Sequence, residues 1–95
     1  MMPGPMPGPM PGLAPARVTL YSKPGCHLCD EMKAVVHRVS ASVPLALDEI
    51  DISGNAELER LYGVEIPVLM VDGKKVAKYR IGESELLRAL TARGR

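Results

Sequence analysis

The sequence has no tryptophan, no phenylalanine and only three tyrosines in 95 residues. A hydrophobic core must therefore be built from aliphatic side chains, and the hydrophobic share of 46% is enough for one small globular domain. Acidic and basic residues are nearly balanced, 11 against 12, and they are interleaved along the chain. Such a pattern offers no basic face for nucleic acid and no basic cluster for anionic lipid. We expect neither nucleic acid nor a membrane as a partner.

Long hydrophobic runs and targeting signals are also missing. No apolar run approaches the roughly 20 residues that a membrane-spanning helix needs. The N-terminus has neither the charged start nor the continuous apolar stretch of a secretory signal peptide. We therefore expect a cytoplasmic protein, acting as a monomer.

Cysteine is scarce, because Cys26 and Cys29 are the only two in the chain. Two are too few for a disulfide scaffold or a four-thiolate zinc site. In a reducing compartment such a pair is more often catalytic or metal-binding than structural. The further zinc ligands would be His27 and His37, but His37 lies about 12 Å along a helix from Cys29. We expect no bound metal and no bound cofactor.

The first 12 residues repeat a Pro-Gly-Pro-Met unit, which cannot hold a helix or a central strand. We assign residues 1–12 to a disordered tail and residues 13–95 to one domain. An alternative for the tail is a soft thioether site for Cu(I), because Met2, Met6 and Met10 recur every four residues.

The rest of the chain alternates strand and helix signals. Strands are predicted at 17–22, 45–52, 66–71 and 74–80, and helices at about 26–41, 56–62 and 83–92. Asp72-Gly73 predicts a two-residue hairpin turn, and Gly63 is expected to end the second helix in a left-handed conformation. The order βαβαββα predicts an α/β fold with a mixed four-stranded sheet flanked by three helices. The expected core residues are Val18, Leu20, Met32, Val36, Val39, Ile50, Leu61, Val68, Met70, Leu86 and Leu90.

The informative motif is Cys26-His27-Leu28-Cys29, where the first strand ends and the first helix begins. Sites in open α/β sheets lie at the carboxyl ends of the strands. The free N–H groups and the positive end of the helix stabilise a thiolate on Cys26, which becomes the attacking sulfur. Cys29 lies about one helical turn further on, so it can attack a mixed disulfide formed on Cys26. The motif predicts two-step thiol–disulfide exchange with an internal resolving thiol.

Two stretches of the chain resemble a known family. Residues 21–29, Tyr-Ser-Lys-Pro-Gly-Cys-His-Leu-Cys, resemble the active-site stretch of glutaredoxins, and residues 61–67, Leu-Tyr-Gly-Val-Glu-Ile-Pro, resemble the segment leading to the cis-proline of the thioredoxin superfamily. The chain is similar to small bacterial glutaredoxin-like proteins with a Cys-His-Leu-Cys site. This resemblance implies a thioredoxin-like fold and oxidoreductase activity, with Cys26 as the nucleophile and Cys29 as the resolving thiol.

The resemblance also implies a substrate site. Pro67 would be the cis-proline that lies against the cysteines, and the backbone of Ile66 would pair with an extended thiol substrate. Lys23 and Lys33 match basic residues that line the glutathione site of glutaredoxins. Alternatively, both residues are ordinary solvated lysines, and Lys33 is placed to pair with Asp30 or Glu31.

Two positions depart from the glutaredoxin pattern. Leu28 stands where an aromatic residue usually precedes the second cysteine, and Gly82 is a single glycine where glutaredoxins carry two, followed by acidic residues that hold the amino end of glutathione. The expected partners are therefore a disulfide-bearing protein or glutathione, and glutathione as a co-substrate stays an open question. His27, when protonated, would favour the thiolate of Cys26 and make the disulfide more oxidising, or it is a solvated histidine at a helix start.

Two other functions use the same cysteine pair. One is a soft-metal carrier for Cu(I), since such chaperones also place C-x-x-C after a first strand. Their expected order is βαββαβ, however, and they carry a methionine where this chain has Lys23-Pro24. The other is a non-enzymatic module that docks a partner through the Pro67 groove or shares an iron–sulfur cluster through Cys26 in a dimer.

Overall fold

The computed structural model of the chain describes residues 15–92. The tail predicted for residues 1–12, with the copper site considered for its methionines, lies outside the described residues. The predicted order of elements is confirmed over the described part. Its elements are β1 (Ala16–Ser22), α1 (His27–Ser40), β2 (Leu45–Asp51), α2 (Ala56–Tyr62), β3 (Val68–Val71), β4 (Lys74–Lys78) and α3 (Glu83–Ala92).

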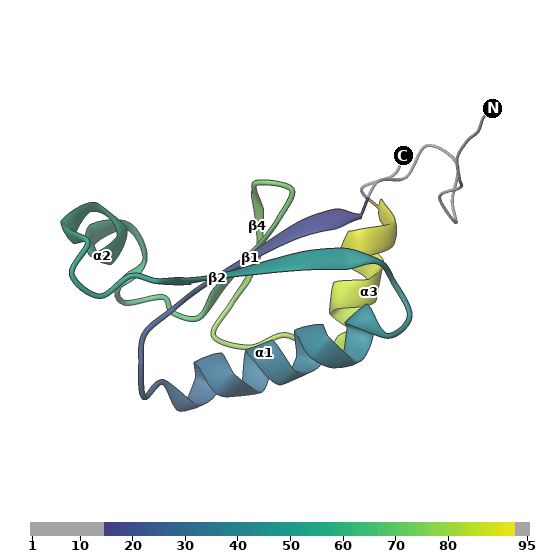
Figure 1. Cartoon of the computed structure of the whole chain (residues 1–95), viewed down its shortest axis with the longest axis horizontal. Coiled ribbons are helices and arrows are strands. Elements are labelled where there is room, and N and C mark those ends of the chain that lie inside the picture. Colours follow the sequence, from purple (N-terminus) through teal and green to yellow (C-terminus); the bar gives the residue numbers. More distant parts are fainter. Residues whose placement is uncertain (1–14, 93–95) are drawn as a thin grey trace.

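The four strands form one mixed sheet in the order β2-β1-β3-β4. β1 and β2 run parallel through the α1 crossover, whereas β1 pairs with β3, and β3 with β4, in antiparallel fashion. Figure 1 shows α1 and α3 against one face of the sheet, and α2 beyond the ends of the strands. The predicted α/β class, with a mixed sheet and three helices, is confirmed. Within residues 15–92, no helix has the length and apolar character needed to cross a bilayer.

The core lies between the sheet and the two helices that cover it. In β1, Val18 and Leu20 are fully buried and point to the helices. The helices supply Met32, Val36 and Val39 from α1 and Leu86 and Leu90 from α3, all with at most 4% of their surface exposed. Burying one such side chain contributes about 1.5–3 kcal/mol, so aliphatic residues alone can hold this fold together.

The expected core was wrong about one face of the sheet. Register pairs Leu20 with Leu69 on the helix side, while Thr19 pairs with Met70 on the opposite side. Met70 and Ile50 are therefore only half-buried, and Leu69 is fully buried in their place. All four residues of β3 are apolar, so the alternation that tells one face from the other is missing from the sequence.

Helix α2 does not contribute to the buried core. No residue of α2 is buried, and Leu61, which was expected in the core, is 47% exposed. Tyr62 stacks on Tyr21 of β1, with ring centroids 4.4 Å apart. Gly63 was also predicted wrongly, because its φ of −55° is right-handed. Glycine is needed there since a Cβ atom would press against the Glu59 carbonyl oxygen, which accepts the Gly63 N–H at 2.8 Å.

The β3–β4 hairpin closes as the sequence predicts. Asp72 and Gly73, with φ of 51° and 84°, form its two-residue turn. The strands are shorter than predicted, since β3 begins at Val68 and β4 ends at Lys78. Tyr79, which was expected inside the last strand, has a φ of 69°, and this left-handed conformation ends the strand.

A substitution pair on α3 tests the core. Leu86→Ala should lower the free energy of unfolding by about 2–5 kcal/mol, because Leu86 is fully buried and its removal leaves a cavity. Leu87→Ala is the matched control on the same helix, and it should cost less than about 1 kcal/mol since Leu87 is 36% exposed. Urea unfolding measures both, and equal losses would contradict the position of α3.

Candidate functional site

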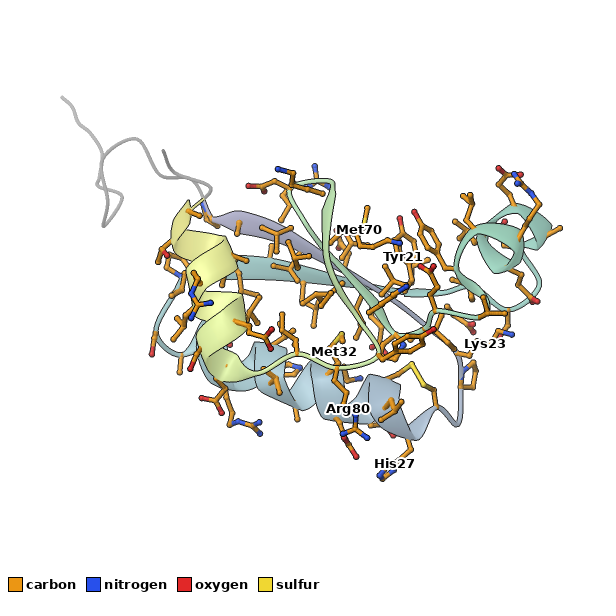
Figure 2. All side chains as sticks on the ribbon, turned by 180° about the vertical axis from the view of Figure 1, so that it is seen from behind. Tyr21, Lys23, His27, Met32, Met70 and Arg80 are labelled. Carbon is orange, nitrogen blue, oxygen red and sulfur yellow. A yellow bond between two sulfur atoms is a disulfide. The ribbon has the colours of Figure 1, made fainter. Side chains whose placement is uncertain are left out.

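The two cysteines differ in their access to solvent. Cys26 is half-buried at the N-cap of α1, whereas Cys29 lies within the helix with 3% of its surface exposed. They are joined as a disulfide, with Cα atoms 5.2 Å apart, and the yellow bond in Figure 2 marks it. The Cys29 N–H also donates a hydrogen bond to Cys26 Sγ at 3.1 Å. A sulfur at this position receives the partial positive charge of the helix start.

A tight turn brings Cys26 to the start of the helix. Ser22 ends β1 with only 4% of its surface exposed, and the Cys26 N–H then donates to the Lys23 carbonyl at 3.3 Å. Gly25 completes the turn with a φ of 78°, a backbone conformation that residues other than glycine rarely adopt. The Cys26 carbonyl accepts the first bond of the helix from Asp30 at 3.2 Å. Cys26 therefore both caps α1 and carries one of the two sulfurs of the site.

Strand pairing brings the predicted proline to this turn. β1 and β3 pair Tyr21 with Val68, so Pro67 lies at the level of Ser22, next to the turn that carries Cys26. The Ile66–Pro67 bond is cis, which is the isomer that the family resemblance implies. Pro67 is buried and Ile66 half-buried. The segment before β3 thus forms a second wall of the site.

The two predicted lysines are both engaged with carboxylates. Lys23 Nζ lies 3.7 Å from Glu59 of α2. Lys33 was expected to pair with an acidic residue of its own helix. It donates instead to Glu49 of β2 at 2.9 Å. This hydrogen bond raises the pKa of Lys33 above its ordinary value. The parallel strand places Glu49 beside α1, and sequence spacing cannot reveal that. The Ser22 hydroxyl, 3.4 Å away, also donates to Glu49.

The lysines also differ in what surrounds them. Lys23 lines a cavity of about 340 Å³ beside the turn, together with Ser22, Asp30, Glu49 and Asp51. Lys33 is not part of that lining. The structure therefore brings Lys23 close to the dithiol turn and directs Lys33 toward β2.

The predicted histidine belongs to a chain of exposed charges. His27 is 85% exposed, and its Nε2 lies 2.9 Å from Glu31, one turn along α1. Arg80, in the segment after β4, lies 3.7 Å from the same carboxylate. Figure 2 shows His27 and Arg80 on the outer side of α1, near the disulfide. Glu31 thus links the first turn of α1 to the segment that leads into α3.

A second cavity, of about 280 Å³, joins Leu28 to Gly82. Met32, Val35 and Ile81 give it an aliphatic lining. The Gly82 N–H donates to the Glu85 side chain at 3.0 Å, so a carboxylate of the chain itself already holds the start of α3. Leu28 and Gly82, the two departures from the glutaredoxin pattern, therefore line the same cavity.

Several residues of the site gave no signal in the sequence. Glu65, just before Ile66, lies 2.7 Å from Lys75 and 3.7 Å from Lys78 of β4. The hydrogen bond from Lys75 lowers the pKa of Glu65 below its ordinary value. Tyr79 donates its backbone N–H to the Pro67 carbonyl at 2.8 Å. These contacts join β4 to a loop about ten residues earlier, a pairing that only the folded hairpin creates.

The described residues contain no cluster of three or more histidine, cysteine or acidic side chains placed to hold a metal ion.

Known sequences resemble this chain over most of its length. Residues 17–91 match the family described as Glutaredoxin-like domain (DUF836). A curated relative, the Glutaredoxin-like protein YDR286C homolog of Dictyostelium discoideum, is 31% identical, and the match covers 73% of this chain and 69% of that protein.

Solved structures show the same fold. The chain is 30% identical to protein XcR50 of X. campestris, with a TM-score of 0.69 over 79% of this chain and 96% of that one. Protein Ne2328 of Nitrosomonas europaea is also 30% identical, with a TM-score of 0.72 over 81% of this chain and 93% of that one. A mutant thioredoxin of Halobacterium salinarum shares 22% identity, a TM-score of 0.63 and coverage of 84% and 75%. The predicted thioredoxin-like fold is confirmed.

The Glu65 ion pairs predict a pH dependence of stability. Because the folded pKa of Glu65 is lowered, the carboxylate stabilises the fold above its unfolded pKa of about 4.3, and this contribution disappears as the pH falls through the folded pKa. Glu65→Gln should therefore lower the urea midpoint at about pH 7, with a smaller difference from the wild type at about pH 3. An equal difference at both pH values would contradict the Glu65–Lys75 contact.

Proposed function

The chain belongs to the glutaredoxin-like family of the thioredoxin superfamily, and on that premise we propose that it is a thiol–disulfide oxidoreductase. The observation that carries the proposal is the unequal access of its two sulfurs. Cys26 is half-buried at the start of α1, while Cys29 is buried within disulfide-bonding distance of it. One sulfur can meet a substrate, and the other can reach only its neighbour.

The reaction runs in two exchange steps. The Cys26 thiolate attacks one sulfur of a substrate disulfide, forming a mixed disulfide and releasing the other substrate sulfur as a thiolate, which takes up a proton. Cys29 then loses its proton and attacks Cys26 Sγ. This second step forms the Cys26–Cys29 disulfide and releases the remaining substrate thiol. Two electrons pass from the dithiol to the substrate, and an external thiol must return them before the next cycle.

The surroundings of Cys26 favour the first step. The N–H groups at the start of α1 stabilise a thiolate at the N-cap, and Cys29 donates one such bond to Cys26 Sγ. His27, when protonated, adds a positive charge next to the attacking sulfur. Glu31 offsets part of that charge, since it lies 2.9 Å from His27. His27 is thus a modest electrostatic aid in this scheme.

We propose a disulfide-bearing protein as the main substrate, with glutathione as a co-substrate. The backbone of Ile66 is the proposed pairing edge for an extended substrate. Lys23 lies in the cavity beside the dithiol turn, and its ion pair with Glu59 is partly exposed. Such pairs contribute only about 0–1 kcal/mol, so a glutathione carboxylate can replace Glu59 on Lys23. Lys33 is a weaker candidate, because its ammonium group is directed toward β2.

We further propose that the protein acts as a monomer in the cytoplasm. A reducing compartment returns the disulfide to the dithiol state that attacks substrates. In this scheme no metal or bound cofactor takes part.

A redox titration tests the proposal. The protein is equilibrated anaerobically over a series of glutathione redox ratios, alkylated to trap free thiols, and weighed intact by mass spectrometry. A cooperative transition of both thiols would support a redox couple, and a glutathione adduct would support glutathione as a co-substrate. Thiols that stay reduced at every ratio would reject the proposal. A metal retained in native spectra would favour a Cu(I) carrier, and visible absorption of an iron–sulfur cluster would favour the docking module.

Cysteine variants test the order of the two steps. Cys26→Ser should abolish exchange, because the only solvent-accessible sulfur of the pair is removed. Cys29→Ser should stop the cycle after the first step and accumulate a mixed disulfide on Cys26, since no internal thiol can resolve it. Both are read by intact mass after incubation with glutathione disulfide. Full turnover in either variant would contradict the assigned roles.

A further inference from the structure

The loop of residues 64–67, which forms the second wall of the site, has little anchorage of its own. Val64 is 88% exposed and Ile66 is only half-buried. Pro67 is the single buried residue of this loop. Apolar burial therefore holds only the end of the loop that leads into β3. The position of the exposed part depends on contacts with other elements.

The end of β4 provides these contacts. The Tyr79 hydroxyl donates to the Val64 carbonyl at 3.1 Å, and its backbone N–H donates to the Pro67 carbonyl at 2.8 Å. Lys75 and Lys78 hold Glu65 between these two bonds, at 2.7 and 3.7 Å. Tyr79 thus contacts both ends of the loop, and its bonds are uncharged and independent of salt.

The backbone of Tyr79 is strained. Its φ is 69°, and the Arg80 N–H donates to the Lys78 carbonyl at 2.8 Å, so Tyr79 is the central residue of a γ-turn. This form of the turn, with positive φ, is rare, and glycine adopts positive φ far more easily than tyrosine does. The Tyr79 ring remains 44% exposed, with Lys78 Nζ 5.6 Å from its centre. Core packing does not explain a tyrosine here, whereas strain of this kind is typical of functional sites.

The strained residue lies beside the dithiol. β3 and β4 pair Val68 with Lys78, which puts Tyr79 across from Pro67 at the same edge of the sheet as Ser22. Tyr79 also lines the cavity that contains Leu28, the residue between His27 and Cys29. Figure 2 shows that the next residue, Arg80, reaches α1, where it meets Glu31 at 3.7 Å.

We propose that Tyr79 is a positioning residue for the substrate of thiol–disulfide exchange, an inference that rests on the proposed function. Its phenol holds the Val64 carbonyl and so keeps the Ile66 backbone in place for a substrate strand beside Cys26. Without the hydrogen bond from the phenol, the loop is ready to bind in a smaller fraction of the molecules. The apparent affinity for the substrate falls in proportion to that fraction. The sulfurs are untouched, so the chemical steps continue at their normal rate.

Tyr79→Phe tests this proposal because it removes only the hydroxyl. The probe is the disulfide of a short cysteine peptide, with dithiothreitol as the reductant. KM should rise about fivefold, the factor that corresponds to one net hydrogen bond, while kcat changes less than about twofold. Tyr62→Phe is the matched control, since it removes a hydroxyl from a stacked ring of α2 and should leave both constants unchanged.

Amide hydrogen exchange on the full chain gives a readout that does not depend on activity. The Glu65 amide, which donates to the Tyr62 carbonyl at 2.8 Å, should exchange about fivefold faster in Tyr79→Phe, while the Leu69 amide of β3 keeps its rate. An unchanged KM or an unchanged Glu65 rate would overturn the proposal. Faster exchange at both Glu65 and Leu69 would also overturn it, because it would indicate general destabilisation.

The two proposals fail in different ways. A wild-type protein that forms the Cys26–Cys29 disulfide but turns over no peptide disulfide would reject the proposed function. In that case the Glu65 exchange rate alone decides whether Tyr79 holds the loop. A wild-type protein that is active, with a Tyr79→Phe variant of equal KM, would reject only the role of Tyr79.

Discussion

The direct passage from β1 into α1 is the constraint on which the rest of the site depends. Parallel pairing of β1 with β2 requires α1 to run back along the sheet, so the start of α1 must lie at the carboxyl edge of β1. Only a short turn separates Ser22 from Cys26. The same geometry leaves Cys26 half-buried at the N-cap and Cys29 buried within α1, which makes the two sulfurs unequal in their access to solvent.

A second set of strands completes the site from the other side. Antiparallel pairing of β1 with β3 brings Pro67 to the level of Ser22, and pairing of β3 with β4 brings Tyr79 across from Pro67. Residues from three separate parts of the sequence thus share one edge of the sheet. The aliphatic core holds this edge only indirectly, and polar contacts from Lys75, Lys78 and Tyr79 hold its exposed loop.

Local patterns in the sequence predicted the features that neighbouring residues decide. The helix start at Cys26 and the Asp72-Gly73 turn each depend on a few adjacent residues, and the structure has both. Features that depend on distant residues were missed. Lys33 pairs with Glu49 across the crossover, not with an acid on its own helix, and an entirely apolar β3 concealed which of its faces is covered.

The amino-acid sequence alone was enough to predict the order of the elements, the mixed sheet and the position of the two cysteines at a helix start. These follow from periodicity, turn residues and capping, which act over one or two helical turns. The tertiary structure alone decided which cysteine is accessible, which carboxylates the lysines meet, and that a strained Tyr79 contacts the loop before β3. Strand register sets these contacts, and a register joins residues far apart in the chain, so no local pattern encodes it.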